Sequence, residues 1–131
     1  MDVIRKSALA VVKGGKLLVV RKGGTRLLLM PGGKLEGSET EIEALHREIK
    51  EELGCGIDGA SIVFLGTFED IAADRAAAVS IGLYSGRLTG KPAACSEIEE
   101  LVWVAASGHP QLSPVIRNRI LPFLVESRLL S

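Results

Sequence analysis

The sequence predicts an α/β fold in which a mixed β-sheet is packed between helices. Three observations lead to this prediction. Short apolar runs typical of strands precede an amphipathic helical segment, further apolar runs follow it, and a second helical segment lies near the C-terminus. Strands on both sides of one helix, with another helix at the end, favour a sheet covered by helices.

Length and composition bound the class of protein. With 131 residues, 47% of them hydrophobic, the chain can bury one sizeable core, and we expect a single domain over residues 1–131. Lys and Arg together number 16 and so do Asp and Glu, so the net charge is zero. A balanced chain has no overall attraction for nucleic acid or an anionic membrane, so any phosphate binding must be local.

Two further features predict a cytoplasmic location. Cys55 and Cys95 make no disulfide framework and have no zinc-site spacing around them, so we expect reduced thiols without a catalytic role. The N-terminus lacks the apolar core of a signal peptide, and no stretch reaches the roughly 18 apolar residues that a membrane-spanning helix needs.

The first third of the chain reads as strands separated by glycine turns. Ser7–Val12 and Leu17–Val20 are predicted to form a hairpin, because Gly14-Gly15 between them supplies the positive φ of a tight turn. Leu27–Met30 is predicted as a third strand, ended by Pro31-Gly32-Gly33. Three later strands are expected at Ser61–Leu65, Ala77–Tyr84 and Leu101–Ala105. The polar stretch between the first two of these contains Glu69, Asp70 and Asp74.

The first helix is predicted to run from Glu39 to Leu53. Ser38 is a suitable N-cap, and Glu41 three residues later completes a capping box. Gly54 is placed to end the helix in the left-handed conformation.

A second helix is expected near the C-terminus, over Pro114–Glu126. Proline disturbs a helix interior because it lacks an N–H and its ring collides with the preceding turn. Pro122 should therefore kink this helix or end it near its last turn.

Three glutamates gather on one face of the first helix. At about 100° per residue, Glu48, Glu51 and Glu52 fall within one sector beside the apolar stripe. A solvated acidic face is the ordinary interpretation, and it suits part of the helix, where Arg47 can pair with Glu43 and Glu51. Glu48 and Glu52 have no cation three or four residues away, so we expect neither to have a local cation. Clustered carboxylates without cations favour a hard divalent ion, Mg²⁺ or Mn²⁺.

The spacing of these residues resembles the box of the Nudix hydrolase family, written G-x5-E-x7-R-E-U-x-E-E-x-G-U with U a bulky apolar residue. Residues 33–55 fill every fixed position, from Gly33 and Glu39 to Gly54. Cys55 in the last position is a departure, because Ile, Leu or Val is more usual there. Flanking segments also look like the family: Pro31-Gly32-Gly33, Glu36-Gly37-Ser38-Glu39 and Glu97-x-x-Glu100-x-x-Trp103.

The resemblance implies an α/β/α sandwich with a mixed sheet, and hydrolysis of a nucleoside diphosphate linked to another group. By position, the residues similar to the family's metal ligands are Glu48, Glu51, Glu52 and a backbone carbonyl of Gly32 or Gly33. Arg47 resembles the residue that orients the glutamates, and Glu39 resembles a supporting residue.

Two roles have alternatives at this point. The general base resembles either a box glutamate, Glu51 or Glu52, or a loop residue, for which Glu97 is the candidate. Arg21 and Lys34 are candidates for phosphate contacts, and a solvated surface position is the alternative for both.

The sequence narrows the substrate to a small nucleotide-type molecule. The Nudix subfamilies that act on ADP-ribose, dinucleoside polyphosphates, NADH or coenzyme A carry marker residues downstream of the box. This sequence lacks those residues, so its resemblance to the family favours a nucleoside triphosphate or a related small diphosphate as substrate. A non-catalytic nucleotide sensor on the same fold is the alternative, although every box glutamate is present. Long nucleic acid is not expected as a partner, and a homodimer is left open.

Overall fold

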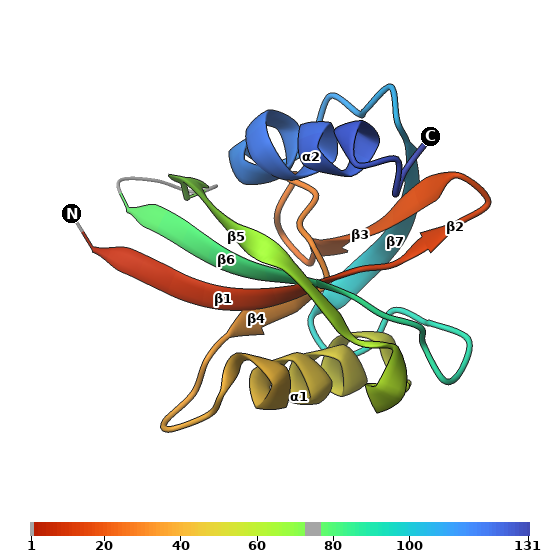
Figure 1. The fold of residues 1–131 in the computed structure, drawn as a ribbon. Coiled ribbons are helices and arrows are strands. Elements are labelled where there is room, and N and C mark those ends of the chain that lie inside the picture. The colour runs from red at the N-terminus through yellow and green to blue at the C-terminus, as the bar shows by residue number, and fades with distance from the viewer. Residues whose placement is uncertain (1, 73–76) are drawn as a thin grey trace.

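The computed structural model describes residues 2–72 and 77–131. Figure 1 shows the elements along the chain. The strands are β1 (Val3–Ala10), β2 (Val12–Lys13), β3 (Lys16–Lys22), β4 (Gly32–Lys34), β5 (Val63–Ile71), β6 (Ala78–Ser85) and β7 (Ile98–Ala105). The helical elements are α1 (Glu41–Leu53), η1 (Gly59–Ser61), η2 (Ile116–Ile120) and α2 (Leu121–Glu126). Within these described residues, no helix is long and apolar enough to cross a membrane.

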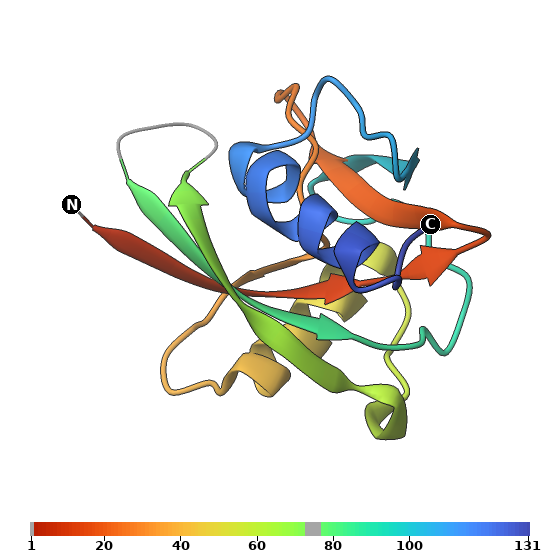
Figure 2. The ribbon, with the colours of Figure 1, turned by 45° about the horizontal axis from the view of Figure 1, so that its top comes forward.

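The strands form two sheets. One has the order β4-β1-β6-β5 and the other has the order β2-β3-β7. The first sheet is mixed, because β1 and β6 run parallel while its other neighbouring strands are antiparallel. Figures 1 and 2 show α1 on one side of the sheets and the segment η2–α2 on the other. The predicted mixed sheet between helices is thus confirmed.

The alternation of side chains along β1 explains why both faces are covered. Leu9 belongs to a buried cluster with Leu45 and Ile49 of α1. Its neighbour Ala8 belongs to a second cluster, which contains Ile116 of η2. Because successive residues of a strand point to opposite faces, β1 buries apolar side chains against both helical layers.

The predicted hairpin is confirmed at its turn and corrected at its first strand. Gly14 and Gly15 have φ of 60° and 75°, and they connect β2 to β3. β1 pairs with β4 and β6 rather than with β3, so residues 7–10 belong to the other sheet. The change of sheet at Val11 lets one continuous apolar run contribute to both sheets.

The third predicted strand, Leu27–Met30, is wrong as a ladder strand. The Leu28 N–H donates to the Gln111 carbonyl and the Leu29 N–H donates to a carbonyl of β3, each at 2.8 Å. The segment therefore contacts two different parts of the chain by single bridges, and this path buries Leu28 in the core. β4 instead begins at Gly32, where the sequence predicts an end.

Two predicted connecting residues, Glu69 and Asp70, lie within β5. β5 is an edge strand whose side chains alternate between exposed and partly buried positions, so carboxylates can stay hydrated there. Asp74 lies outside the described residues.

Helix α1 begins two residues later than predicted, and its cap is different. The capping box consists of Thr40 and Glu43, not Ser38 and Glu41: the Thr40 hydroxyl accepts from the Glu43 N–H at 3.1 Å, and the Glu43 carboxylate accepts from the Thr40 N–H at 2.8 Å. The C-terminus is as predicted, because Gly54 is left-handed with φ of 69° and its N–H donates to Lys50.

The C-terminal helical segment continues through Pro122, contrary to a simple break. Residues 114–126 are helical, with a π turn at η2 in which the Leu121 N–H donates to the Ile116 carbonyl. The wider turn directly precedes the proline, where an ordinary helical turn would be crowded by the proline ring. The helix does not end at Pro122, and its irregularity is a π turn directly before that residue.

Candidate active site

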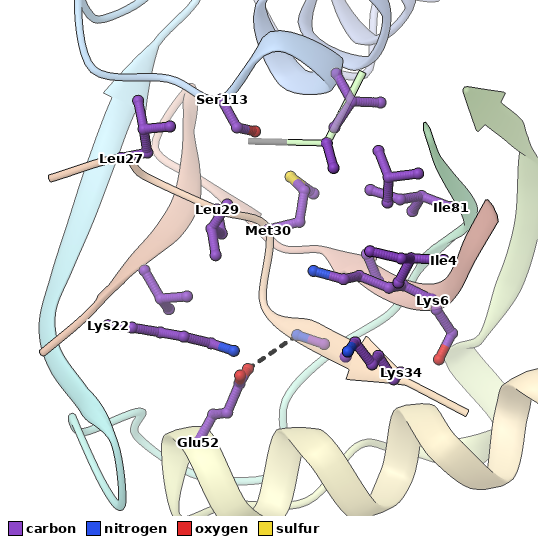
Figure 3. A pocket seen from close by; sticks show the side chains of 18 of the residues that line it. Ile4, Lys6, Lys22, Leu27, Leu29, Met30, Lys34, Glu52, Ile81 and Ser113 are labelled. Carbon is purple, nitrogen blue, oxygen red and sulfur yellow. Dashed lines mark hydrogen bonds between the residues drawn. The ribbon is translucent and has the colours of Figure 1, made fainter. Parts of the chain in front are cut away.

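Helix α1 places two glutamate carboxylates against the glycines of β4. Burial of its apolar residues against β1 and β3 fixes the rotation of the helix, so Glu52 faces β4 and its side chain is only 2% exposed. The Gly32 N–H donates to Glu52 Oε1 at 2.9 Å, as Figure 3 shows. The second oxygen, Oε2, has no hydrogen-bond partner within the described residues.

Gly33 gives Glu48 its place beside the same strand. A methyl group on Gly33 would collide with the Glu48 carboxylate, so this carboxylate occupies the space where any other residue would have its Cβ. The box glycine is therefore required by a close approach of backbone and carboxylate, and the two predicted metal ligands Glu48 and Glu52 meet at β4.

Replacing Gly33 by alanine is expected to lower turnover by about tenfold with little loss of stability. The collision is with the flexible end of a side chain, so Glu48 would be displaced while the backbone stays in place. The matched control is Gly59→Ala, because nothing lies near a Cβ at Gly59. Turnover and melting temperature of the two variants, measured together, check the prediction. Equal turnover in both would show that the position of Glu48 is unimportant.

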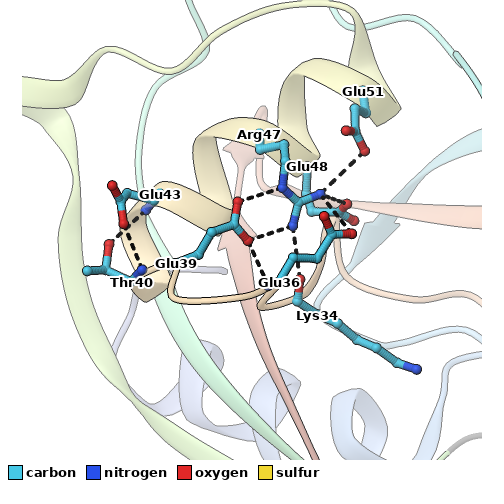
Figure 4. A network of polar contacts seen from close by, with 8 residues as sticks. All are labelled: Lys34, Glu36, Glu39, Thr40, Glu43, Arg47, Glu48 and Glu51. Atoms are coloured by element: carbon cyan, nitrogen blue, oxygen red, sulfur yellow. Dashed lines mark hydrogen bonds and ion pairs between the residues drawn. The ribbon is translucent and has the colours of Figure 1, made fainter.

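Arg47 is the centre of a network of carboxylates, shown in Figure 4. Its Nε and Nη2 donate to the two oxygens of Glu39 at 2.6 and 2.9 Å. Its Nη1 donates to Glu48 at 2.6 Å and to Glu51 at 3.5 Å, while Nη2 also donates to the Lys34 carbonyl at 3.0 Å. Arg47 thus connects the loop before α1 with the acidic face of the helix, and its orienting role stays a prediction.

This network confirms one predicted ion pair and corrects two statements. The Arg47–Glu51 pair is present, but Glu43 caps the helix and Arg47 pairs with Glu39 instead. Glu48 does have a local cation, because the long Arg47 side chain reaches its next neighbour in sequence. Helix-surface rules consider residues three or four apart, so they miss this contact.

The charges of the network are strongly coupled. Hydrogen bonds from Arg47 and from the Glu36 N–H lower the pKa of Glu39 to about 2. The same Glu39 contact, together with Glu48, raises the pKa of Arg47, so the guanidinium stays charged. Arg47 and Glu39 therefore form a permanent charge pair at the base of the site.

Burial disfavours the ionised forms of Glu48 and Glu52. Burial raises the pKa of Glu52 to about 7, and the charges of Glu48 and Glu97 act in the same direction. The Gly32 N–H and the charge of Lys22 oppose the shift. Burial also raises the pKa of Glu48, against the effect of Arg47. Both carboxylates would therefore gain from an additional positive charge.

The metal-free protein is expected to lose stability as pH rises from about 5 to about 8. The folded state holds the Glu52 proton more tightly than the unfolded chain, whose pKa is near 4.5, so ionisation above that pH disfavours the folded state. The loss amounts to at most about 3 kcal/mol. Chemical denaturation at several pH values measures it, and Glu52→Gln should show a flatter profile. A wild-type profile that rises over this window would contradict the buried, raised carboxyl.

A pocket of about 420 Å³ extends from Glu52 toward η2–α2. Its lining includes four cationic side chains, Lys6, Lys22, Arg26 and Lys34, and one acid, Glu52. A cationic lining of this kind suits an anionic ligand such as a phosphate group. Lys34, a predicted phosphate contact, is thus placed at the pocket.

Arg21 and Lys22 are neighbours in β3, and their side chains point to opposite faces of the strand. Arg21, the other predicted phosphate contact, does not line the pocket, and its guanidinium pairs with Glu100 at 2.8 Å and Glu99 at 3.7 Å. The next residue, Lys22, lines the pocket and points toward Glu52 in Figure 3. Sequence reasoning missed Lys22, because alternation separates the two cations but does not tell which face carries the site.

Glu97 lies near the site but is exposed. Its carboxylate is 3.5 Å from the Lys22 Nζ, and its carbonyl accepts from the Gly23 N–H at 2.9 Å. Its charge contributes to the raised pKa of Glu52. The candidate base from the loop is therefore within electrostatic reach of the buried glutamate.

The third predicted metal ligand, Glu51, does not contact β4. Its side chain is 54% exposed and contacts Arg47. Among residues 2–72 and 77–131, no three His, Cys, Asp or Glu side chains form a group that could hold a metal ion. Glu48 and Glu52 reach β4, whereas Glu51 stays outside.

Cys55 and Cys95 are free thiols, and burial raises the pKa of Cys55, which is unfavourable for a thiolate nucleophile.

Comparison with known proteins places this arrangement in context. The NUDIX domain family matches residues 3–121. A crystal structure of a MutT NUDIX hydrolase from Burkholderia pseudomallei superposes with a TM-score of 0.75 at 25% identity, covering 92% of this chain and 96% of that one. The MutT protein from Methanosarcina mazei Go1 gives a TM-score of 0.76 at 20% identity, covering 97% and 96%, which shows similarity of fold.

One curated relative is similar over a short segment. An RNA pyrophosphohydrolase from Halorhodospira halophila (strain DSM 244 / SL1) is 43% identical over 42 residues, which are 32% of this chain and 23% of that protein. The chain therefore aligns with less than a quarter of the length of this relative.

Proposed function

The chain belongs to the Nudix hydrolase family, and from that premise we propose that it hydrolyses the diphosphate linkage of a small nucleotide-type substrate with the help of a divalent metal ion. The observation that carries the proposal is the meeting of the Glu48 and Glu52 carboxylates at β4, beside a pocket with four cationic side chains. The carboxylates suit a metal ion, and the cations suit phosphate groups.

The residues present fit a bound Mg²⁺ or Mn²⁺ ion. Glu52 has a buried oxygen without a hydrogen-bond partner within the described residues, and the Glu48 carboxylate approaches the same strand at Gly33, so two carboxylates converge on one place. We propose Glu48 and Glu52 as ligands, with the carbonyl of Gly32 or Gly33. Glu51, which is exposed and contacts Arg47, would have to turn toward β4 to become a third ligand. The ion would neutralise phosphate charge and lower the pKa of a bound water.

The remaining residues of the site bind and orient. Arg47 holds Glu48 and Glu51 by direct hydrogen bonds and is itself fixed by Glu39. We propose that Lys22 and Lys34 bind the phosphates from the pocket wall. Neutralising charge that grows on the phosphates favours the transition state over the bound substrate.

A carboxylate must accept a proton from the attacking water. We propose a glutamate of α1, Glu51 or Glu52, as this acceptor. Glu97 is exposed and paired with Lys22, so it is the alternative acceptor from the loop. If Glu97→Gln keeps the turnover and pH profile of the wild type, Glu97 is not the general base, and a glutamate of α1 accepts the proton of the attacking water.

Lys22→Ala is expected to raise KM by about tenfold, through loss of a phosphate contact. Arg21→Ala is the matched comparison, because the neighbouring cation pairs with Glu99 and Glu100 outside the pocket. We expect a smaller change in KM for Arg21→Ala. Steady-state kinetics of both variants test this expectation. A larger rise in KM for Arg21→Ala than for Lys22→Ala would show that Arg21, not Lys22, contacts the phosphates.

The test of the proposed function is a hydrolysis assay with chromatographic separation of the products, over a panel of diphosphate compounds with Mg²⁺ and with Mn²⁺. The panel includes nucleoside triphosphates, nucleoside diphosphate sugars and a 5′-triphosphorylated RNA, the last because of the short similarity to an RNA pyrophosphohydrolase. We expect turnover of a nucleoside triphosphate or a related small diphosphate. Binding of nucleotides without turnover of any of them would favour a sensor. Cytoplasmic location and a homodimer stay predictions.

A further inference from the structure

Helix α1 approaches the sheet β4-β1-β6-β5 at a second glycine besides Gly33. A methyl group on Gly82, in the middle of β6, would collide with the Glu41 carboxylate, which therefore occupies the space of the missing side chain. Glycine weakens the interior of a strand, and it is suited to places where another group comes close. Gly82 thus gives Glu41, the first residue of α1, a defined place on the sheet.

A tyrosine holds the Glu41 carboxylate at this place. The Tyr84 hydroxyl donates to Glu41 Oε1 at 2.6 Å. Tyr84 is buried, and the centre of its ring lies 5.2 Å from that of Phe64. Burial and the contact with Glu41 raise the pKa of Tyr84 to about 12, so the hydroxyl stays protonated near neutral pH. Tyr84 therefore remains a hydrogen-bond donor to the first turn of α1.

The two glycines under α1 lie in one row across the sheet. Gly33 of β4 and Gly82 of β6 both pair with Ser7 of β1, which runs between these strands. Figure 1 shows α1 beneath this sheet. Glu41 and Glu48 are seven residues apart, so they lie on one face of the helix, about 10 Å from each other along its axis. Movement of the helix along the sheet would take both carboxylates out of their spaces at once.

We propose that Glu41 and Tyr84 are positioning residues of the metal site: their contact holds α1 in the place where its two proposed ligands converge at β4. The inference rests on the proposed function, which assigns a metal ion to Glu48 and Glu52. Neither Glu41 nor Tyr84 lines the pocket, so they act through the helix and not by contact with metal or substrate. Carboxylates that are already in place bind an ion more tightly, because less freedom is lost on binding.

The first measurement is calorimetric binding of Mn²⁺ in the absence of substrate, which does not depend on turnover. Tyr84→Phe keeps the ring and removes only the hydroxyl, and we expect Mn²⁺ to bind about fivefold more weakly. Glu41→Ala should have a similar effect. Glu41→Gln should restore most of the affinity, because its amide oxygen can accept from the Tyr84 hydroxyl.

The second measurement tests the glycine. A Cβ at residue 82 would displace the Glu41 carboxylate, so Gly82→Ala should also weaken Mn²⁺ binding about fivefold. The double variant Gly82→Ala/Glu41→Ala should bind Mn²⁺ no more weakly than either single variant, because both substitutions remove the same contact. Phe64→Leu is the control, since it changes the packing on the Tyr84 ring and leaves the hydrogen bond in place. Its Mn²⁺ affinity should equal that of the wild type.

Melting temperatures without metal distinguish positioning from general stability, and Tyr84→Phe decides if a larger substitution unfolds the chain. Unchanged Mn²⁺ affinity in folded Tyr84→Phe, with turnover retained, would overturn the inference and leave the proposed function standing. Equal weakening in Phe64→Leu would overturn it as well, because the effect would then follow from packing alone. A wild type that binds no Mn²⁺ and hydrolyses no diphosphate would remove the proposed function and the inference with it.

Discussion

Glu52→Gln and Glu48→Gln are each expected to reduce turnover by at least about a hundredfold, on the order of 3 kcal/mol in the barrier. Both carboxylates lie at β4 beside the pocket, Glu52 through the Gly32 N–H and Glu48 in the space left by Gly33. Glutamine keeps size and polarity but removes one charge, so metal affinity and neutralisation of the phosphates would both decrease. Steady-state kinetics at saturating metal measure the effect.

The melting temperatures of the metal-free variants show whether the loss of turnover comes from the missing charge or from damage to the fold. Burial disfavours ionised Glu52, and the charges of Glu48 and Glu52 repel one another, so removing either charge should leave the metal-free melting temperature unchanged or higher. Glu43→Gln is the control, because glutamine can preserve the capping box with Thr40 and Glu43 lies outside the site. Loss of activity caused by unfolding, or equal loss in Glu43→Gln, would make the acidic face structural.

Removal of divalent metal is expected to abolish turnover. The carboxylates of Glu48 and Glu52 converge at β4, and a chelator would withdraw the cation that we propose for this place. Addition of Mg²⁺ or Mn²⁺ in excess over the chelator should restore the reaction. Full hydrolysis in excess chelator would falsify the metal-dependent mechanism.

A binding measurement tests the metal without relying on activity. An ion that binds only the folded protein raises its melting temperature, so Mg²⁺ or Mn²⁺ should stabilise the wild type. The shift should be smaller in Glu52→Gln and unchanged in Glu43→Gln. Equal shifts in all three proteins would place the ion elsewhere on the molecule.

The sequence by itself determined the family and the features that depend on near neighbours. The spacing from Gly33 to Cys55 identified the box, and the family match over residues 3–121 confirms it. The turn at Gly14-Gly15 and the helix end at Gly54 were predictable, because a positive φ is a local requirement that glycine meets best. The grouping of the glutamates on one helix face follows from the helical repeat alone.

Only the tertiary structure decided which partners these residues have. Arg47 had several carboxylates within reach, and the folded loop before α1 selected Glu39 as its strongest partner. The alternation of β3 separated Arg21 from Lys22, but the packing of the two sheets placed Lys22 at the pocket.

The pocket is the feature that could least be predicted from the sequence. Glu52 and Ser113 lie far apart in the sequence, and both line one pocket together with residues of β1, β3, β4 and β6. Local rules act over three or four residues, so they locate the carboxylates of the site. The shape between the layers depends on contacts among distant segments, which only the folded chain brings together.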